Sequence, residues 1–256
     1  EFANGELHGR FGESVRGTDV FIIQTHAGHG DISVNDAIME QLILVDAAKR
    51  ASAKRITAVA PFYGYARQDR KSEGREPITA KLIANMFAAA GAKRLISVDL
   101  HSGQIQGFFD GPVDHLTAMP VLVEYMAGLG KDLVVVSPDA GRVKVAERYA
   151  NALHADLAIV HKRRVKGVKN TVEARDVVGD VDGRVCVLID DMIDTGGTIV
   201  AAADQLRSRG ATEIYAACTH GVFSGPAIER LQDSCISKVV TTCLLYTSDA
   251  ADDTPC

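Results

Sequence analysis

Tryptophan is absent from this chain, proline occurs only seven times, and aromatic residues make up 5% of the sequence. No apolar run approaches the roughly 18 residues of a membrane-crossing helix, and the first residues lack the basic-then-apolar order of a signal peptide. We therefore expect neither membrane insertion nor export. The 28 Lys and Arg residues are outnumbered by 33 Asp and Glu residues, so no overall positive field is present to attract nucleic acid.

Cysteine is also scarce, and its spacing follows no metal-binding pattern. The five cysteines lie at positions 186, 218, 235, 243 and 256, and none forms a C-x-x-C pair or a cluster with histidine. Because the number is odd and the spacing irregular, neither a zinc site nor a disulfide framework is indicated. We expect a reducing, cytoplasmic location.

The composition that is present is that of an ordinary globular protein, with 46% hydrophobic and 24% charged residues. At roughly 150 residues per domain, 256 residues correspond to about 1.7 domains. Short apolar runs alternate with longer amphipathic stretches, which is typical of a parallel sheet flanked by helices. Strands are expected at 19–24, 55–60, 94–98, 132–136, 156–160, 185–189 and 213–218. Helices are expected at 34–51, 77–90, 119–128, 142–153 and 198–209.

A stretch with two prolines, Gly111–Pro120, is the best candidate for a junction between domains. We therefore expect two α/β domains of similar build, each a mostly parallel sheet flanked by helices. In such sheets ligands bind outside the carboxyl ends of the strands. The residues that follow the predicted strands are the candidates for a functional site.

The strongest motif is Val185–Thr198, VCVLIDDMIDTGGT. A buried strand delivers Asp190 and Asp191, and Gly196 and Gly197 then open a helix. Backbone N–H groups turned inward, together with the helix N-terminus, make a cradle for phosphate. The adjacent carboxylates can hold sugar hydroxyls or a metal that accompanies phosphates. The alternative is a glycine-rich helix start with acidic caps; the strand and the paired aspartates favour the phosphate-and-sugar interpretation.

Two further segments follow strands expected in the first half. Phe62–Arg75 carries four basic and three aromatic residues, and Arg67 with Gln68 suits a purine nucleotide. A solvated basic loop or a nucleic-acid contact is the alternative. Asp99 and His101 could hold a metal or a phosphate, or His101 could be structural.

The second half contributes two more segments. Ser137–Gly141 places Asp139 after a strand, either as a ligand or as a simple helix N-cap. His161–Lys169 is strongly basic and begins where the strand expected at 156–160 ends. A loop that closes over phosphates is favoured there, and a solvated charged face is the alternative.

Together these motifs resemble the ribose-phosphate pyrophosphokinase family. The matching pieces are FANGE at 2–6, YGYARQD at 63–69, DLHSGQIQGFF at 99–109, SPDAG at 137–141, KRR at 162–164 and VLIDDMIDTGGT at 187–198. They stand in the family's order and cover residues 1 to about 242. The resemblance implies two tandem type I phosphoribosyltransferase-like domains, at 1–117 and 118–242, and assembly into hexamers.

The resemblance also implies an activity, in which the diphosphoryl group of Mg-ATP passes to ribose 5-phosphate. Ribose 5-phosphate would be bound by Asp190, Asp191, Asp194, Thr195, Gly196, Gly197 and Thr198. ATP would be bound by Arg67 and Gln68, and by Phe2, Asn4, Gly5 and Glu6 in a loop that reaches a neighbouring subunit. His101, Asp139 and Asp99 would serve Mg²⁺. Lys162 and Arg164 would stabilise the transferring group as catalytic residues.

Two alternatives remain open at this point. A purine or pyrimidine phosphoribosyltransferase would share 187–198 but has no need of YGYARQD, and a non-catalytic regulatory relative would be expected to lack catalytic or metal residues that are present here. The family's chains normally begin about thirty residues before Phe2, and the resemblance fades after Thr242. We therefore expect a chain shortened at both ends, with residues 243–256 a non-native tail.

Overall fold

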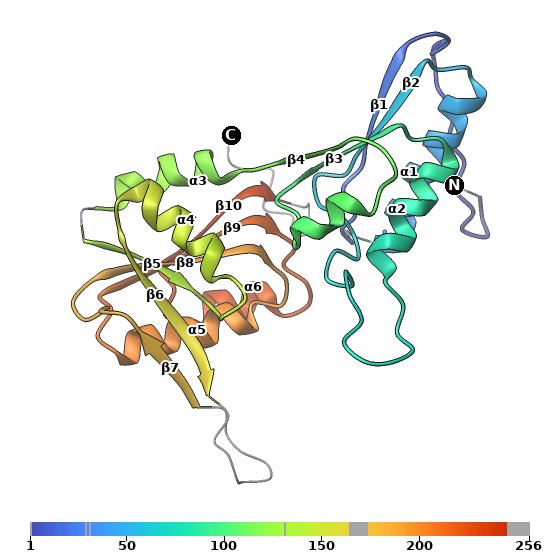
Figure 1. Cartoon of the computed structure of the whole chain (residues 1–256). Coiled ribbons are helices and arrows are strands. Elements are labelled where there is room, and N and C mark those ends of the chain that lie inside the picture. The colour runs from blue at the N-terminus through green and yellow to red at the C-terminus, as the bar shows by residue number, and fades with distance from the viewer. Residues whose placement is uncertain (1, 29, 31, 131, 164–173, 245–256) are drawn as a thin grey trace. The chain divides into compact units, whose positions relative to one another are not determined.

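The computed structural model describes residues 2–28, 30, 32–130, 132–163 and 174–244 (Figure 1). They form two compact units, with the boundary between Thr117 and Ala118. Among these residues, no helix combines the length and the apolar character needed to cross a membrane.

The N-terminal unit is a parallel sheet in the order β1-β2-β3-β4. The strands are β1 (Asp19–Ile23), β2 (Arg55–Val59), β3 (Arg94–Val98) and β4 (Val113–Leu116), and the helices are α1 (Val34–Arg50), α2 (Thr79–Ala90) and the 3₁₀ helix η1 (Gly103–Gly107). A capping box between Ser33 and Asp36 starts α1. Apolar side chains of α1 and α2 pack on one face of the sheet and form the core of this unit.

The C-terminal unit is a six-stranded sheet in the order β10-β9-β8-β5-β6-β7, in which only β7 is antiparallel to its neighbour. The strands are β5 (Leu133–Ser137), β6 (Asp156–Arg163), β7 (Ala174–Val178), β8 (Val185–Ile193), β9 (Glu213–Gly221) and β10 (Lys238–Leu244). The helices are α3 (Met119–Met126), α4 (Val143–Leu153), α5 (Gly197–Ser208) and α6 (Ala227–Gln232), and a 3₁₀ turn, η2 (Ala127–Leu129), follows α3.

The central strands of this unit have continuous apolar sequences, and their side chains belong to two separate clusters of buried residues. One cluster includes Leu206 of α5, and the other includes Leu122 of α3 and Ala146 of α4. Because apolar side chains cover both faces of the sheet, every residue of β5 is buried. The predicted fold class, two α/β domains with mostly parallel sheets, is confirmed.

Several element boundaries differ from the sequence-based expectation. β4 lies inside the stretch expected to be a junction, and β7, β10 and α6 were not predicted. β8 continues to Ile193 rather than ending at Ile189, because it stays paired with β9 up to Gly221. β10 reaches Leu244, two residues into the segment expected to be a tail. Strand pairing, which the local sequence does not encode, extends these elements.

Candidate active site

The paired carboxylates lie within β8 and not beyond its end. Asp190 is in register with Cys218 of β9, inside the parallel ladder. The neighbour on the other side is β5, whose following loop brings Arg142 to the same place. Arg142 Nε lies 3.2 Å from Asp190 Oδ1, and Arg142 Nη2 lies 2.7 Å from Asp191 Oδ1. One guanidinium therefore holds both carboxylates.

Burial dominates the electrostatics of this pair. The Asp191 side chain is 6% exposed and that of Asp190 16% exposed. Burial, with the adjacent Asp191 carboxylate, raises the pKa of Asp190 above its ordinary range, and the Arg142 guanidinium opposes this rise. The site thus places two carboxyl groups, of which Asp190 has a raised pKa, beside a fixed positive charge.

The turn after β8 has the backbone geometry that its glycines allow. Gly196 is left-handed, with φ 72°, and serves as the N-cap residue of α5, a helix that begins at Gly197. The backbone N–H of α5's first turn and its partial positive charge face the end of β8 in such a strand–turn–helix arrangement. This local structure fits the predicted phosphate cradle at Asp194–Thr198.

Residues that follow β9 secure this turn. The N–H groups of Val222 and Phe223 both donate to the carbonyl of Ile193 at 3.0 Å, and Ser224 N–H donates to the carbonyl of Asp194 at 3.0 Å. Arg230 of α6 donates to the carbonyl of Thr195 at 2.5 Å. The cradle is therefore held from one side by backbone and by a charged donor.

The Asp139 carboxylate accepts hydrogen bonds from the backbone that follows it. Its Oδ1 accepts hydrogen bonds from the N–H of Gly141, at 2.7 Å, and of Arg142, at 3.2 Å. The Ser137 hydroxyl donates to the Asp139 carbonyl at 2.7 Å. The N-cap residue of α4 is Arg142, without a side-chain cap, so Asp139 is not the helix cap that the sequence also allowed. Its hydrogen bonds instead fix the turn that carries Arg142.

Lys162 lies inside a strand, which corrects the expectation of a loop beginning after Val160. β6 lies beside the antiparallel β7 (Figure 1). It runs to Arg163, and Lys162 is in register with Arg175 of β7. The strand extends beyond its apolar residues because the backbone of 161–163 pairs with the backbone of β7. Arg164 lies outside the described residues.

In the N-terminal unit, the loop after β2 carries Arg67 and Gln68, both exposed. The Gln68 Oε1 accepts a hydrogen bond from the Thr79 hydroxyl at 2.5 Å, next to the start of α2. Tyr65 is left-handed, with φ 60°, and its hydroxyl donates to Asn35 Oδ1 at 2.5 Å. A left-handed non-glycine residue is costly, and such residues gather at functional sites.

A buried histidine anchors this loop. His26 Nδ1 accepts the N–H of Gly64 at 3.1 Å, and its Nε2 lies 2.8 Å from Gln41 Oε1. Gln41 Nε2 in turn donates to the carbonyls of Ile22 and Val59, at the ends of β1 and β2. Burial lowers the pKa of His26 to about 4, so the ring is neutral and both nitrogens are satisfied at neutral pH.

The segment after β3 lies beside the same loop. Asp99 is left-handed, with φ 39°, and its N–H donates to the carbonyl of Leu116 in β4. Gln104, in the 3₁₀ helix η1, donates from Nε2 to Asp69 Oδ2 at 2.6 Å. The structure therefore brings the loops that contain Arg67 and His101 together at one edge of the sheet.

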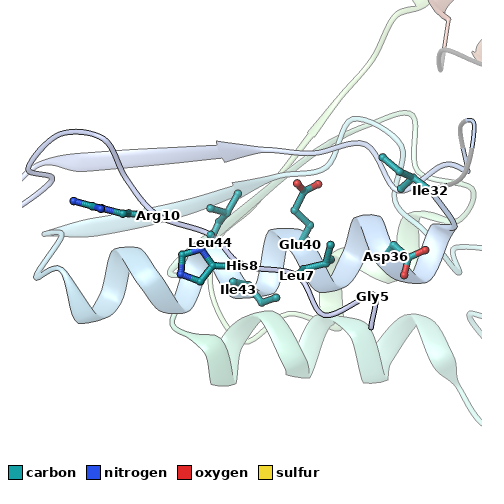
Figure 2. Close-up of a pocket in the computed structure, with 10 residues that line it drawn as sticks. Gly5, Leu7, His8, Arg10, Ile32, Asp36, Glu40, Ile43 and Leu44 are labelled. Carbon is teal, nitrogen blue, oxygen red and sulfur yellow. The ribbon is translucent and has the colours of Figure 1, made fainter. Parts of the chain in front are cut away.

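The N-terminal residues expected to bind ATP form a tight, exposed turn. Phe2 N–H donates to the carbonyl of Glu6, and Gly5 N–H donates to the carbonyl of Phe2. Gly5 has φ 88°, which the turn requires and glycine tolerates. Beside it, a cavity of about 570 Å³ lies between this segment and α1, and Figure 2 shows His8 and Glu40 among its lining.

The donors present bear on whether the chain can hold magnesium. Among the described residues, no group of three or more His, Cys, Asp or Glu side chains is arranged to hold a metal. Mg²⁺ needs no such cage, because it keeps several waters and is usually held by one or two carboxylates with substrate phosphates. Asp99 and Asp139 are oxygen donors of the kind that Mg²⁺ prefers, whereas the imidazole of His101 is a less typical ligand.

Sequence analysis missed three functional candidates: Arg142, Arg230 and His26. Each acts through a contact between segments distant in the chain, so no local motif marks it. Arg142 directly follows the motif SPDAG, and a charged residue that follows a predicted ligand loop was the available signal.

The fold and these sites define an α/β protein with a mostly parallel sheet in each of two units and ligand candidates at the carboxyl ends of the strands. The sequence model described as the N-terminal domain of ribose phosphate pyrophosphokinase matches residues 1–91, and that described as the phosphoribosyl synthetase-associated domain matches residues 168–249. The chain belongs to the ribose-phosphate pyrophosphokinase family. The second match extends seven residues beyond Thr242.

Individual relatives support this assignment. The chain is 59% identical to a ribose-phosphate pyrophosphokinase of Streptomyces avermitilis over 249 residues, which is 96% of this chain and 76% of that protein. It is 58% identical to that of Streptomyces coelicolor, over 94% of this chain and 74% of that protein. A crystal structure of phosphoribosylpyrophosphate synthetase from Mycobacterium smegmatis matches with a TM-score of 0.88 and 52% identity, covering 97% of this chain and 80% of that one.

Proposed function

We propose that this chain, a transferase of diphosphate groups, transfers the β,γ-diphosphoryl group of Mg-ATP to the anomeric hydroxyl of ribose 5-phosphate. The anomeric oxygen attacks the β-phosphorus, the bond from that phosphorus to the α,β-bridging oxygen breaks, and AMP leaves. The hydroxyl proton is released, and the product is 5-phosphoribosyl 1-diphosphate. The observation that carries the proposal is 59% identity to a ribose-phosphate pyrophosphokinase over three quarters of its length.

The acceptor site of this proposal is the end of β8. Asp190 and Asp191 accept hydrogen bonds from the ribose hydroxyls, and the Asp194–Thr198 turn binds the 5-phosphate through the N-terminus of α5. The clamp of Arg142 on both carboxylates supports this role, because it keeps acceptors oriented at the sheet edge. A fixed acceptor lowers the entropic cost of reaching the in-line geometry.

The ATP site of the proposal combines Arg67 and Gln68 with the N-terminal turn Phe2–Glu6, which includes Asn4 and Gly5. In the proposed hexamer this turn belongs to a neighbouring subunit. The exposure of Phe2, at 57%, supports a contact outside the unit. The hydrogen-bonded loops after β2 and β3 support a common nucleotide site.

Mg²⁺ ions would be held by Asp99 and His101 of the N-terminal unit and by Asp139 of the C-terminal unit, and when bound they would neutralise phosphate charge. Lys162 and Arg164 supply positive charge to the transferring group, since phosphoryl-type transfer depends on positioning and electrostatic stabilisation. We also infer a cytoplasmic location. Its support is that Cys186 and Cys218 are buried free thiols, as is usual in a reducing compartment.

The test is an AMP-release assay on the chain with ribose 5-phosphate and Mg-ATP, and with EDTA as the metal-free control. AMP that forms only when ribose 5-phosphate and Mg²⁺ are both present supports the proposal. Base-dependent pyrophosphate release from 5-phosphoribosyl 1-diphosphate would instead indicate a phosphoribosyltransferase. Binding of both substrates without turnover would indicate a regulatory relative.

A further inference from the structure

Arg142 contacts both predicted ribose carboxylates, and its side chain is 13% exposed. It is the N-cap residue of α4, and its backbone N–H donates to Asp139 Oδ1 at 3.2 Å, which fixes the turn that carries it. Successive residues in a strand normally point to opposite faces of the sheet. One guanidinium nevertheless reaches the carboxylates of both Asp190 and Asp191, at 3.2 and 2.7 Å.

We propose that Arg142 is a positioning residue of the ribose site, which keeps Asp190 and Asp191 oriented and thereby sets the affinity for ribose 5-phosphate. The inference rests on the proposed function, which assigns the two carboxylates to the ribose hydroxyls. Arg142 lies outside every motif identified in the sequence.

Charge and geometry give the physical reason. Two adjacent carboxylates in a buried site repel one another, and a cation that contacts both of them opposes this repulsion and the uptake of a proton. A protonated carboxyl presents a donor where the ribose hydroxyl needs an acceptor. The planar fork of arginine reaches both groups at once, whereas the single ammonium of lysine supplies the charge without the two-point geometry.

The experiment is calorimetric titration of the full chain with ribose 5-phosphate, which requires no turnover. Arg142→Gln is expected to weaken ribose 5-phosphate binding at least tenfold. Arg142→Lys is expected to weaken it by a smaller factor, because the charge is restored. Arg148→Gln, at an exposed position of the same helix α4, is the matched control and is expected to leave the affinity unchanged.

Titration with ATP separates loss of positioning from general damage to the fold, because the proposed ATP contacts belong to the other unit. The affinity of Arg142→Gln for ATP is expected to stay within twofold of that of the unaltered chain. If the unaltered chain does not bind ribose 5-phosphate, both the proposed function and this inference fail. If the unaltered chain binds and Arg142→Gln binds equally well, only this inference fails. If Arg142→Gln does not fold by circular dichroism, Arg142→Lys decides, and an affinity equal to that of the unaltered chain overturns the role.

Discussion

The guanidinium of Arg230 donates a hydrogen bond to the backbone carbonyl of Thr195, with 2.5 Å between Nη1 and the oxygen. A Cβ atom added at Gly197 would lie 3.3 Å from the same guanidinium nitrogen. Helix α6 therefore supports the turn between β8 and α5 through a charged donor, although α6 has only six residues.

Arg230→Gln is expected to loosen this turn and weaken ribose 5-phosphate binding about threefold to tenfold. A hydrogen bond from a charged donor is worth about 1.5 kcal/mol or more when buried, and less at this half-exposed position. Calorimetric titration measures the change. Arg209→Gln, which removes an exposed ion pair with Asp176, is the matched control and is expected to leave binding unaffected.

Gly196→Ala is expected to lower both stability and phosphate binding. Gly196 has φ 72°, and an alanine in that conformation costs about 1 kcal/mol. Gly183 provides a matched control, since it has the same φ of 72° and open space around it. Thermal unfolding is expected to show similar losses for the two variants. Only Gly196→Ala is expected to weaken ribose 5-phosphate binding, and equal weakening by Gly183→Ala would contradict a specific cradle.

The buried His26 predicts a pH dependence of stability. Its pKa is lowered from 6.5 to about 4 in the folded chain, so between these values the unfolded state binds the extra proton. The free energy of unfolding is therefore expected to fall as the pH drops below about 6.5 and to level off below about 4. At 1.36 kcal/mol per pKa unit, the loss amounts to about 3 kcal/mol. Urea unfolding at a series of pH values measures it.

His26→Asn isolates this contribution from the titration of carboxyl groups. An asparagine oxygen can still accept the N–H of Gly64, but no imidazole remains to protonate in the unfolded state. The variant is expected to be less stable at pH 7 and to lose about 3 kcal/mol less than the unaltered chain on acidification. Parallel pH profiles for the two proteins would show that His26 does not titrate as described.

Lys162→Ala is expected to reduce AMP formation by two or more orders of magnitude and to leave ribose 5-phosphate affinity within twofold. The reason is that charge at the transferring group is needed mainly in the transition state. Rapid-quench and calorimetric measurements separate the two quantities. Lys144→Ala, at an exposed position of α4, is the control. Unchanged turnover in Lys162→Ala would remove that residue from the mechanism.

Much of the fold could be predicted because the central strands are apolar on both faces. β3 has the bounds that its sequence predicted, and β2 differs by one residue. The edge elements β4 and β7 were missed, because VDHL and ARDVV contain charged residues and become strands only through pairing with β3 and β6. The short α6 has too few residues to show a helical period.

The site was predictable to the extent that it is local. The sequence of Val185–Thr198 indicated a strand, a glycine turn and a helix, and the left-handed Gly196 is the geometry such a turn needs. The ion pairs of Arg142 depend on β5 lying next to β8, although some fifty residues of chain separate these strands. The roles of the site residues in binding and catalysis remain predictions.

The backbone hydrogen bonds from Val222, Phe223 and Ser224 to the end of β8 also bear on protein engineering. The turn at 194–198 is one half of a two-part structure whose other half follows β9. A graft of 185–198 into another α/β scaffold would therefore leave the carbonyls of Ile193 and Asp194 without their donors. Only a transplant that carries both segments, with α6, would move the cradle intact.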